Sequence, residues 1–176
     1  VDTIPANTIV NPAYNRVVQY SPVNGKDIVP DLAESWDVSK DGLTYTFKVR
    51  QGVKFHNGTP LTAEDIAFTL NRVTFPPKGI NPVVSSFVAP STDKITVIDS
   101  NTVQVKLKSP FAPLLSAYAM DTVPVYSKAW VEQKGEMKTT IMGTGPFKFG
   151  AFTPSVDAKM VRNPDYWVKG RPYLDG

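Results

Sequence analysis

The sequence predicts a mixed α/β domain in which antiparallel hairpins pack with short helices. Two stretches, 36–50 and 95–108, alternate apolar and polar side chains on either side of a turn, as strands with one buried face do. An amphipathic helix is indicated after residue 62. Sixteen of the 176 residues are proline, against an average usage of about 5%. Proline ends helices and avoids central strands, so this excess argues against a bundle of long helices.

The segment before the first hairpin is expected to be loop-like at first. An apolar-polar stretch follows at 14–20, and Asn24-Gly25 is a strong turn signal. Residues 29–36 predict a short turn or a single helical turn that ends in a buried Trp36.

The first hairpin joins residues 36–38 to residues 44–50 through a turn at Asp41-Gly42. Glycine supplies the positive φ that such a turn favours. In the second strand every other side chain is apolar, which predicts one core-facing and one exposed face. The predicted core-facing residues are Tyr45, Phe47 and Val49.

Residues 52–60 predict a short strand that runs into a tight turn, and a helix follows it. Thr62 is a good N-cap, and Glu64 and Asp65 place negative charge in the first turn, where the helix dipole favours it. Pro76-Pro77 ends the helix. Its apolar stripe is Ile66, Ala67, Leu70 and Val73.

The second half alternates irregular and regular segments. Residues 74–93 are the longest stretch predicted to be irregular, and a hairpin of 95–98 with 102–108 follows. Short helices are predicted within 110–120 and around Trp130. A Gly/Pro turn then leads into two strands, predicted at 147–149 and 157–161.

Composition excludes several classes of protein. The net charge is +3 with scattered basic residues, so no nucleic-acid partner is expected. No apolar run approaches the ~20 residues of a membrane span, so direct membrane insertion is not expected either. The absence of cysteine excludes disulfides, thiolate chemistry and cysteine-based zinc sites. The first residues carry neither the basic nor the apolar region of a signal peptide.

Catalytic chemistry finds little support. His56 is the only histidine and is interpreted as a surface or turn residue, with a hydrolase that uses it as a remote alternative. Glu64 and Asp65 point about 100° apart on a helix, so they do not face one substrate. Residues 143–146 could cradle an anion, but a plain turn explains them better, because the pattern lacks a following lysine. The sequence therefore predicts no enzyme, no metal site and no cofactor.

Three groups of segments carry a family resemblance. The first is VPDLAESW at 29–36 followed by DGLTYTFKVR at 41–50, the second is GVKFHNGTPLTAED at 52–65, and the third is GTGPF at 143–147 with RNPDYW at 162–167. In this order and spacing they resemble the N-terminal part of family 5 extracellular solute-binding proteins. That group contains the dipeptide-, oligopeptide- and nickel-binding proteins of ABC importers. The resemblance covers almost the whole chain.

The resemblance implies a fragment of a type II periplasmic binding-protein fold, a bilobed receptor that encloses its ligand between two lobes. Residues 1–28 would end the opening segment of the first lobe. Residues 29–140 would form an α/β subdomain distinctive of the family, and 141–176 would return into the first lobe. The second lobe would be missing from this chain. Apolar surface that an intact protein would cover is therefore expected near both termini.

The motif segments themselves look like scaffold, so candidate ligand contacts come from other positions. They are taken from the extended N-terminal segment, the 82–87 loop and the 119–121 stretch. The candidates are Thr3, Ile4, Phe87, Ala119, Met120 and Asp121.

The implied function is the substrate-binding component of an ABC transporter, which captures a small solute, most readily a peptide, by closure of two lobes. Its partners would be that solute and a membrane permease. It would act in the periplasm or outside the cell, lipid-anchored in some organisms. The alternative is an effector-sensing domain of a transcription regulator, because some regulators carry a similar domain behind a DNA-binding head.

Overall fold

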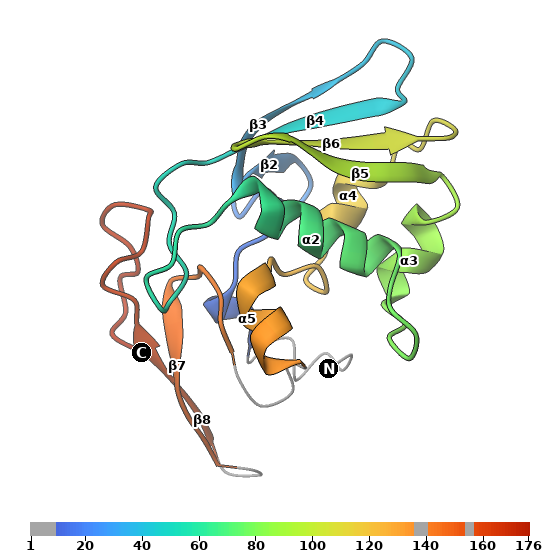
Figure 1. The fold of residues 1–176 in the computed structure, drawn as a ribbon. Helices are drawn as coiled ribbons and strands as arrows, with labels where there is room; N and C mark the ends of the chain where they lie inside the picture. The colour runs from blue at the N-terminus through green and yellow to red at the C-terminus, as the bar shows by residue number, and fades with distance from the viewer. Residues whose placement is uncertain (1–9, 136–140, 154–156) are drawn as a thin grey trace.

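The computed structural model describes residues 10–135, 141–153 and 157–176. The helices are η1 (Asn11–Ala13), α2 (Ala63–Thr74), α3 (Val83–Val88), α4 (Leu114–Tyr118) and α5 (Lys128–Lys134). The strands are β1 (Val18–Tyr20), β2 (Ile28–Pro30), β3 (Ala33–Val38), β4 (Thr44–Val49), β5 (Thr92–Asp99), β6 (Thr102–Leu107), β7 (Phe147–Thr153) and β8 (Asp157–Arg162). The mixed α/β class is confirmed (Figure 1).

The largest sheet has four antiparallel strands in the order β3-β4-β6-β5. It contains both predicted hairpins, β3 with β4 and β5 with β6. Helix α2 runs along one face of the sheet (Figure 1). The burial of β4 alternates as predicted, since Tyr45, Phe47 and Val49 are buried while the residues between them are half-buried. The period-2 pattern therefore identified the core face of this sheet correctly.

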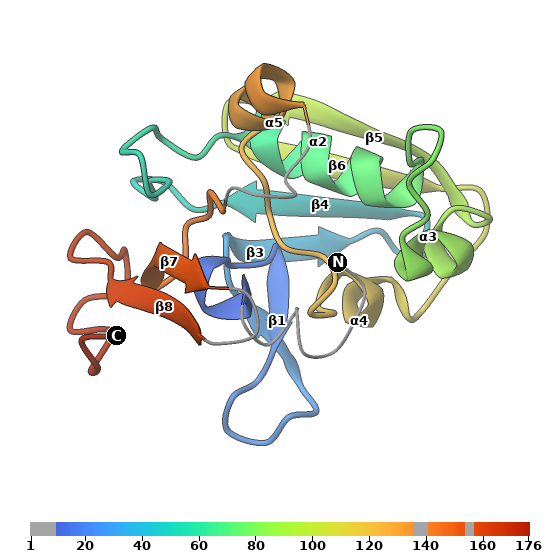
Figure 2. The ribbon, with the colours of Figure 1, turned by 90° about the horizontal axis from the view of Figure 1, so that it is seen from below.

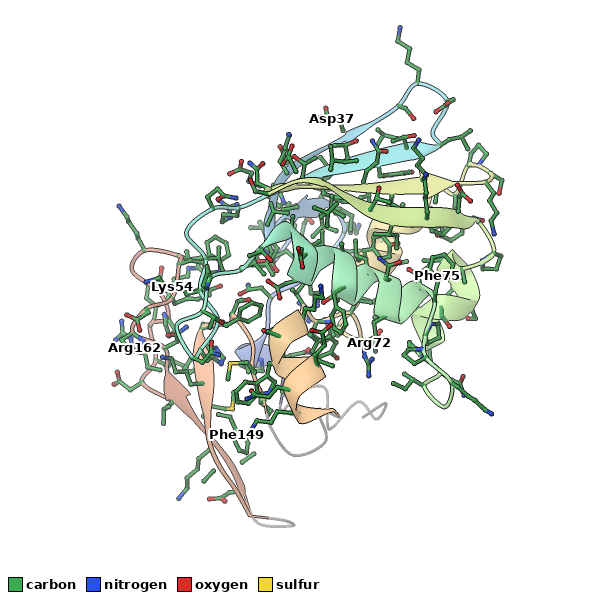
Figure 3. All side chains as sticks on the ribbon, viewed as in Figure 1. Asp37, Lys54, Arg72, Phe75, Phe149 and Arg162 are labelled. Atoms are coloured by element: carbon green, nitrogen blue, oxygen red, sulfur yellow. The ribbon has the colours of Figure 1, made fainter. Side chains whose placement is uncertain are left out.

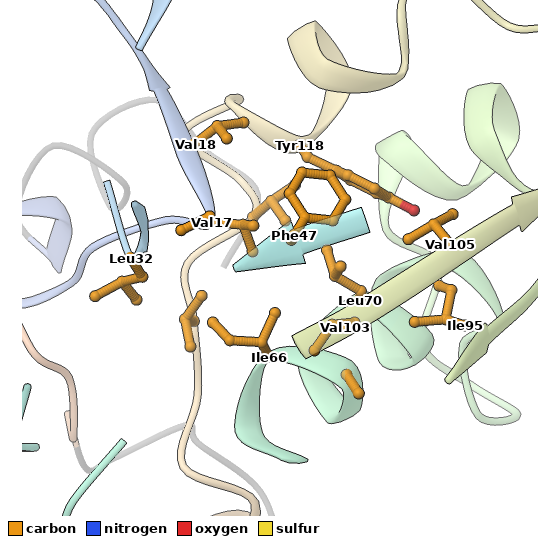
Figure 4. Close-up of a cluster of buried hydrophobic side chains, with 14 of the residues drawn as sticks. Val17, Val18, Leu32, Phe47, Ile66, Leu70, Ile95, Val103, Val105 and Tyr118 are labelled. Carbon is orange, nitrogen blue, oxygen red and sulfur yellow. The ribbon is translucent and has the colours of Figure 1, made fainter. Parts of the chain in front are cut away.

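The core lies between this sheet and the helices that cover it (Figure 4). Phe47 sits opposite Val103 on β6, and both are fully buried. Ile66 and Leu70 of α2 pack into the same cluster. Tyr118 at the end of α4 is also fully buried, and its hydroxyl lies 3.4 Å from Thr74 Oγ1. Tyr118 is thus a core residue whose polar end has a partner.

The prediction for residues 29–36 was wrong, because this segment forms strands instead of a turn. β2 pairs with β1, and Ala33 at the start of β3 donates its N–H to the Val17 carbonyl at 2.8 Å. Local sequence favoured a turn because Pro30 and Asp31 stand together. Pairing with segments nearby in space decided the outcome, and Trp36 is half-buried against the core.

Residues 74–93 contain a helix that the sequence did not predict. Helix α3 has six residues and follows Pro82. Its β-branched residues and serines are modest helix formers. Val84 and Val88 are nevertheless fully buried, so packing of one face stabilises a helix that propensity alone would not.

Two further predictions need smaller corrections. Residues 52–60 keep the tight turn, but the predicted strand is a single bridge between Lys54 and Pro60. Lys54 lies in the loop near β7 (Figure 3). At the other end of the chain, Tyr173 and Leu174 are 80% and 68% exposed, which confirms apolar surface near the C-terminus. Residues 1–9 lie outside the described part of the chain.

Helix α2 begins at a capping arrangement that also holds α5. Asp65 Oδ2 accepts hydrogen bonds from the Thr62 backbone N–H at 2.9 Å and the Thr62 hydroxyl at 2.8 Å. Asp65 Oδ1 accepts from the Lys128 backbone N–H at 2.8 Å. The predicted first-turn charge is therefore a buried carboxylate that joins the starts of two helices.

Replacing Asp65 by alanine should lower the free energy of unfolding by about 2 kcal/mol, since three hydrogen bonds are lost and buried donors are left without partners. Chemical denaturation measures the change. The matched control is Glu64→Ala, which removes only the solvent-exposed Glu64–Lys128 ion pair of 2.9 Å and should leave the denaturation midpoint almost unchanged. Equal effects of the two variants would contradict this account of the cap.

Candidate functional site

The structure describes two of the three predicted candidate regions, the 119–121 stretch and the segment that contains Phe87. The 119–121 stretch contacts the N-terminal segment. The described chain starts after Thr3 and Ile4, which leaves these two candidates outside it. The stretch 119–121 directly follows α4, which contacts β1 (Figure 2). Phe87 lies on α3 with 52% of its surface exposed. Its role as a ligand contact stays a prediction.

An ion pair with Arg16 anchors the 119–121 stretch. The Arg16 guanidinium donates from Nη2 to Asp121 Oδ1 at 2.6 Å and from Nε to the Met120 carbonyl at 3.2 Å. The Arg16 side chain is 16% exposed, whereas that of Asp121 is 68% exposed. Ala119 is buried beside them. Arg16 and residues 119–121 therefore form one surface, in which a half-buried cation holds an accessible carboxylate.

A buried polar cluster lies behind Arg16. Its centre is Asn15, whose Nδ2 donates to Asp31 Oδ1 at 2.9 Å and to the Tyr166 hydroxyl at 3.3 Å. Asn15 Oδ1 accepts from Thr144 Oγ1 at 3.2 Å and from Trp167 Nε1 at 3.3 Å. We refer to these five residues as the Asn15 cluster. It joins four segments that are far apart in the sequence.

Asp31 is the ionisable centre of the cluster. Its carboxylate also accepts the Arg16 backbone N–H at 2.7 Å. Burial raises the pKa of Asp31 to about 6, although the hydrogen bonds and positive charges around it act in the opposite direction. One of those charges is Arg50, whose Nε donates to the Asp31 carbonyl at 3.1 Å and whose guanidinium carbon lies 4.7 Å from the centre of the Trp167 ring.

Sequence reasoning missed the Asn15 cluster, although most of its members stand in segments that it quoted. Asp31 belongs to VPDLAESW, Thr144 to GTGPF, and Tyr166 and Trp167 to RNPDYW. These segments were interpreted as scaffold, which their hydrogen bonds support. The signal that could have suggested the cluster is Asn15 itself, a polar residue between the apolar Tyr14 and Val17, both of which are buried.

His56 contacts the backbone of the Gly/Pro turn. Its Nε2 lies 3.1 Å from the Gly145 carbonyl, and its backbone N–H donates to the Gly143 carbonyl at 2.9 Å. A carbonyl only accepts, so Nε2 carries the proton. Burial lowers the pKa of His56, with Lys148 contributing. The interpretation as a turn histidine is supported, because both hydrogen-bond partners are backbone atoms.

Over the described residues, no group of three or more His, Cys, Asp or Glu side chains is placed to hold a metal ion. Within the same part of the chain, no helix has the length and apolar character that crossing a bilayer requires.

The family follows from a comparison with known proteins. The model for "Bacterial extracellular solute-binding proteins, family 5 Middle" matches residues 27–176. This chain belongs to the family 5 bacterial extracellular solute-binding proteins. The resemblance read from the sequence is therefore confirmed.

Individual relatives agree with the family. The chain is 35% identical to di/tripeptide-binding protein 2 of Pseudomonas aeruginosa (strain UCBPP-PA14), over 94% of this chain and 34% of the relative. It is 34% identical to heme-binding protein A of Haemophilus influenzae, over 92% of this chain and 33% of the relative. The chain thus spans about one third of the length of these relatives.

A solved structure has the same fold. It is the periplasmic binding protein DppA of Helicobacter pylori in complex with the peptide STSA, with a TM-score of 0.86 and 29% identity. The match covers 99% of this chain and 38% of that protein. The prediction of a periplasmic binding-protein-like fold is confirmed.

Proposed function

We propose that this chain is part of the substrate-binding component of an ABC transporter and that its solute is a peptide. The observation that carries the proposal is the 35% identity, along 94% of the chain, to a di/tripeptide-binding protein. The similar protein in complex with the peptide STSA supports the same class of ligand. Relatives also include a heme-binding protein, so the ligand class remains the part of the proposal that needs an experiment.

The proposed mechanism is capture by closure between two lobes, with this chain supplying one wall. Residues 1–28 and 141–176 would belong to the first lobe and 29–140 to the family's additional subdomain. The surface formed by Arg16 and 119–121 would face the ligand, together with Thr3, Ile4 and Phe87. A peptide offers an ammonium group and backbone N–H groups. These groups can donate hydrogen bonds to the exposed carboxylate of Asp121.

The proposed partners follow from this role. A membrane permease would receive the solute, and the receptor would act in the periplasm or outside the cell, in agreement with the description of the family as extracellular. The relatives named above are binding proteins and not enzymes, and we propose the same for this chain, with no cofactor. None of them is described as a transcription regulator, so no observation favours that alternative.

A ligand screen tests the proposed function. The full-length gene product should show a rise in melting temperature with a free tripeptide, because a ligand at about 100 times its dissociation constant stabilises the folded state by about 2.7 kcal/mol. Scanning fluorimetry measures the rise. A tripeptide with blocked termini tests whether binding needs the charged peptide termini. Heme tests whether the ligand belongs to a different chemical class. A rise with heme and none with any free peptide would contradict the peptide assignment.

A matched pair of variants tests the site. Asp121→Ala should reduce the peptide-induced rise in melting temperature while leaving the melting temperature without peptide nearly unchanged, because the Asp121 side chain is 68% exposed. Asp37→Ala removes an exposed carboxylate on β3, an edge strand of the four-stranded sheet (Figure 3). It should leave both values unchanged. An equal response of the two variants to peptide would remove Asp121 from the proposed site.

A further inference from the structure

Arg16 connects the buried Asn15 cluster to the candidate ligand surface. Its backbone N–H donates to Asp31 Oδ2 at 2.7 Å inside the cluster. Its guanidinium donates to the Met120 carbonyl and to Asp121 at the surface. The main chain of Arg16 is therefore held at one end and its side chain at the other. Any change that moves the main chain away from Asp31 also moves the guanidinium relative to α4.

Both oxygens of the Asp31 carboxylate face hydrogen-bond donors. Oδ1 accepts from Asn15 Nδ2 at 2.9 Å, and Oδ2 accepts from the Arg16 N–H. Asn15 cannot turn its amide over without loss, because its Oδ1 already accepts from Thr144 and Trp167. Only the ionised carboxylate offers two strong, charged acceptors. A proton on either oxygen turns that oxygen into a hydroxyl, which is a poor acceptor, and so weakens one of the two hydrogen bonds.

We propose that Asn15 and Asp31 are positioning residues for the ligand surface, and that protonation of the Asp31 carboxylate releases Arg16 from Asp121. In the ionised state the cluster fixes the main chain at Arg16, so that its guanidinium reaches the end of α4. In the protonated state the Arg16 N–H loses its charged acceptor, and the main chain of Arg16 keeps only the bond from the Leu32 N–H to the Arg16 carbonyl at 3.0 Å. The consequence for ligand binding, a site that weakens in acid, rests on the proposed function.

The surroundings of Asp31 place this proton uptake close to neutral pH. Asp31 is 1% exposed, and burial raises its pKa to about 6. The charged and titratable groups that face it are Arg16, Arg50 after β4, and Tyr166 from the C-terminal segment. Burial raises the pKa of Tyr166, so its hydroxyl stays neutral in this range. Asp31 is thus the member of this group that changes its charge near pH 6.

Two side-chain N–H signals in NMR spectra report separately on the Asn15 cluster and on the surface formed by Arg16 and 119–121. Trp167 Nε1 reports the cluster, because it donates to Asn15, and Arg16 Nε reports the surface, because it donates to Met120. We expect both NMR signals of the ¹⁵N-labelled full-length gene product to shift between about pH 7.5 and about pH 4.5 with one common midpoint near 6. Trp167→Phe and Arg16→Lys assign the signals. Signals that stay unchanged, or that titrate with different midpoints, would overturn the inference.

Variants identify the titrating group. Asp31→Asn cannot ionise and presents a donor where the carboxylate accepts, so both signals should keep their acid positions at every pH. Asp37→Asn changes an exposed carboxylate on β3 and should leave the common midpoint unchanged. If Asp31→Asn does not fold, Arg16→Lys decides, because it keeps the backbone N–H to Asp31 and should preserve the Trp167 midpoint. The proposal would be overturned if the two signals of Asp31→Asn titrated as in the wild type. It would also be overturned if the Trp167 signal of a folded Arg16→Lys variant no longer titrated with the wild-type midpoint.

Binding is measured separately, with trialanine as the probe. The dissociation constant should rise about five-fold or more between pH 7.5 and pH 5 in the wild type and should be weak at both values in Asp31→Asn. If the two signals share a midpoint but trialanine binds at neither pH, the proposed function fails while the positioning role stands. If trialanine binds equally well at both values, the proposed function stands and the link from Asp31 to the ligand surface is refuted.

Discussion

Replacing Gly145 by alanine should lower the free energy of unfolding by about 3 kcal/mol or more, because no space exists for the added methyl group. A Cβ at this position would overlap the Ala13 carbonyl carbon and lie 2.5 Å from both the Pro12 oxygen and the Tyr14 nitrogen. All three are backbone atoms, which cannot turn aside as a side chain can. Denaturant titration, or loss of soluble protein, reports the change.

The close approach of the Gly145 backbone to the N-terminal segment allows hydrogen bonds between the two. Gly145 donates its N–H to the Ala13 carbonyl at 3.0 Å. The Gly145 carbonyl accepts from Asn163 Nδ2 at 3.0 Å and contacts His56 Nε2 at 3.1 Å. The alanine variant would push apart the N-terminal segment and the Gly/Pro turn, and both carry members of the Asn15 cluster.

A second glycine serves as the control for Gly145. Gly58 lies in the turn beside His56 with φ +85 and has no atom within 4 Å of an added Cβ. Gly58→Ala should therefore cost only the backbone strain of a left-handed residue, about 1–2 kcal/mol. A Gly145→Ala variant that is no less stable than Gly58→Ala would show that the two segments do not approach as closely as described.

The second large effect is expected for Asn15→Leu. Leucine has the branched shape of asparagine but no hydrogen-bonding group, so two buried and two half-buried partners lose their bonds to residue 15 together. Leaving a buried polar group without a partner costs about 1–3 kcal/mol each, and a loss of about 4 kcal/mol in the free energy of unfolding is the expected sum. The four partners are Asp31, Thr144, Tyr166 and Trp167.

Gln19→Leu is the matched control for Asn15→Leu. Gln19 stands on β1 four residues later and makes one long, exposed hydrogen bond of 3.4 Å to the Pro30 carbonyl. Its loss should change the free energy of unfolding by less than about 0.5 kcal/mol. Trp167 fluorescence adds a local readout, because the indole N–H loses its acceptor in Asn15→Leu alone. A small effect of Asn15→Leu with unchanged Trp167 emission would contradict the central role of Asn15.

The strands of the main sheet could be predicted because their pattern is local. In β4 and β6 the apolar residues alternate with polar ones, and this period decides both the secondary structure and the buried face. Helix α2 was predictable for the same reason, since its capping residues and apolar stripe lie within one segment.

The elements that could not be predicted depend on distant partners. β2 forms because β1 offers a strand to pair with, and α3 forms because Val84 and Val88 find a core to fill. In 29–36 and 74–93 the prolines and turn-forming residues interrupt any regular apolar pattern, so the local sequence favours turns. Tertiary contacts outweighed those propensities in both segments.

The candidate site shows the same division. The family resemblance pointed to 119–121, but only the fold shows that Arg16 reaches this stretch from about a hundred residues earlier in the chain. Asn15 and Asp31 were not predicted to bond one another, because nothing local links an amide to a carboxylate sixteen residues away. Residues that act through long-range hydrogen bonds leave no periodic signal in one sequence.

Isothermal calorimetry with a free tripeptide tests the central claim most directly, which is that this chain supplies one wall of a two-lobed peptide receptor. The full-length gene product should bind one tripeptide per chain with a dissociation constant of about 1 μM or below. Residues 1–176 alone, checked for folding by circular dichroism, should show no binding in this range. No peptide binding by the full-length gene product, or micromolar binding by residues 1–176 alone, would contradict the claim.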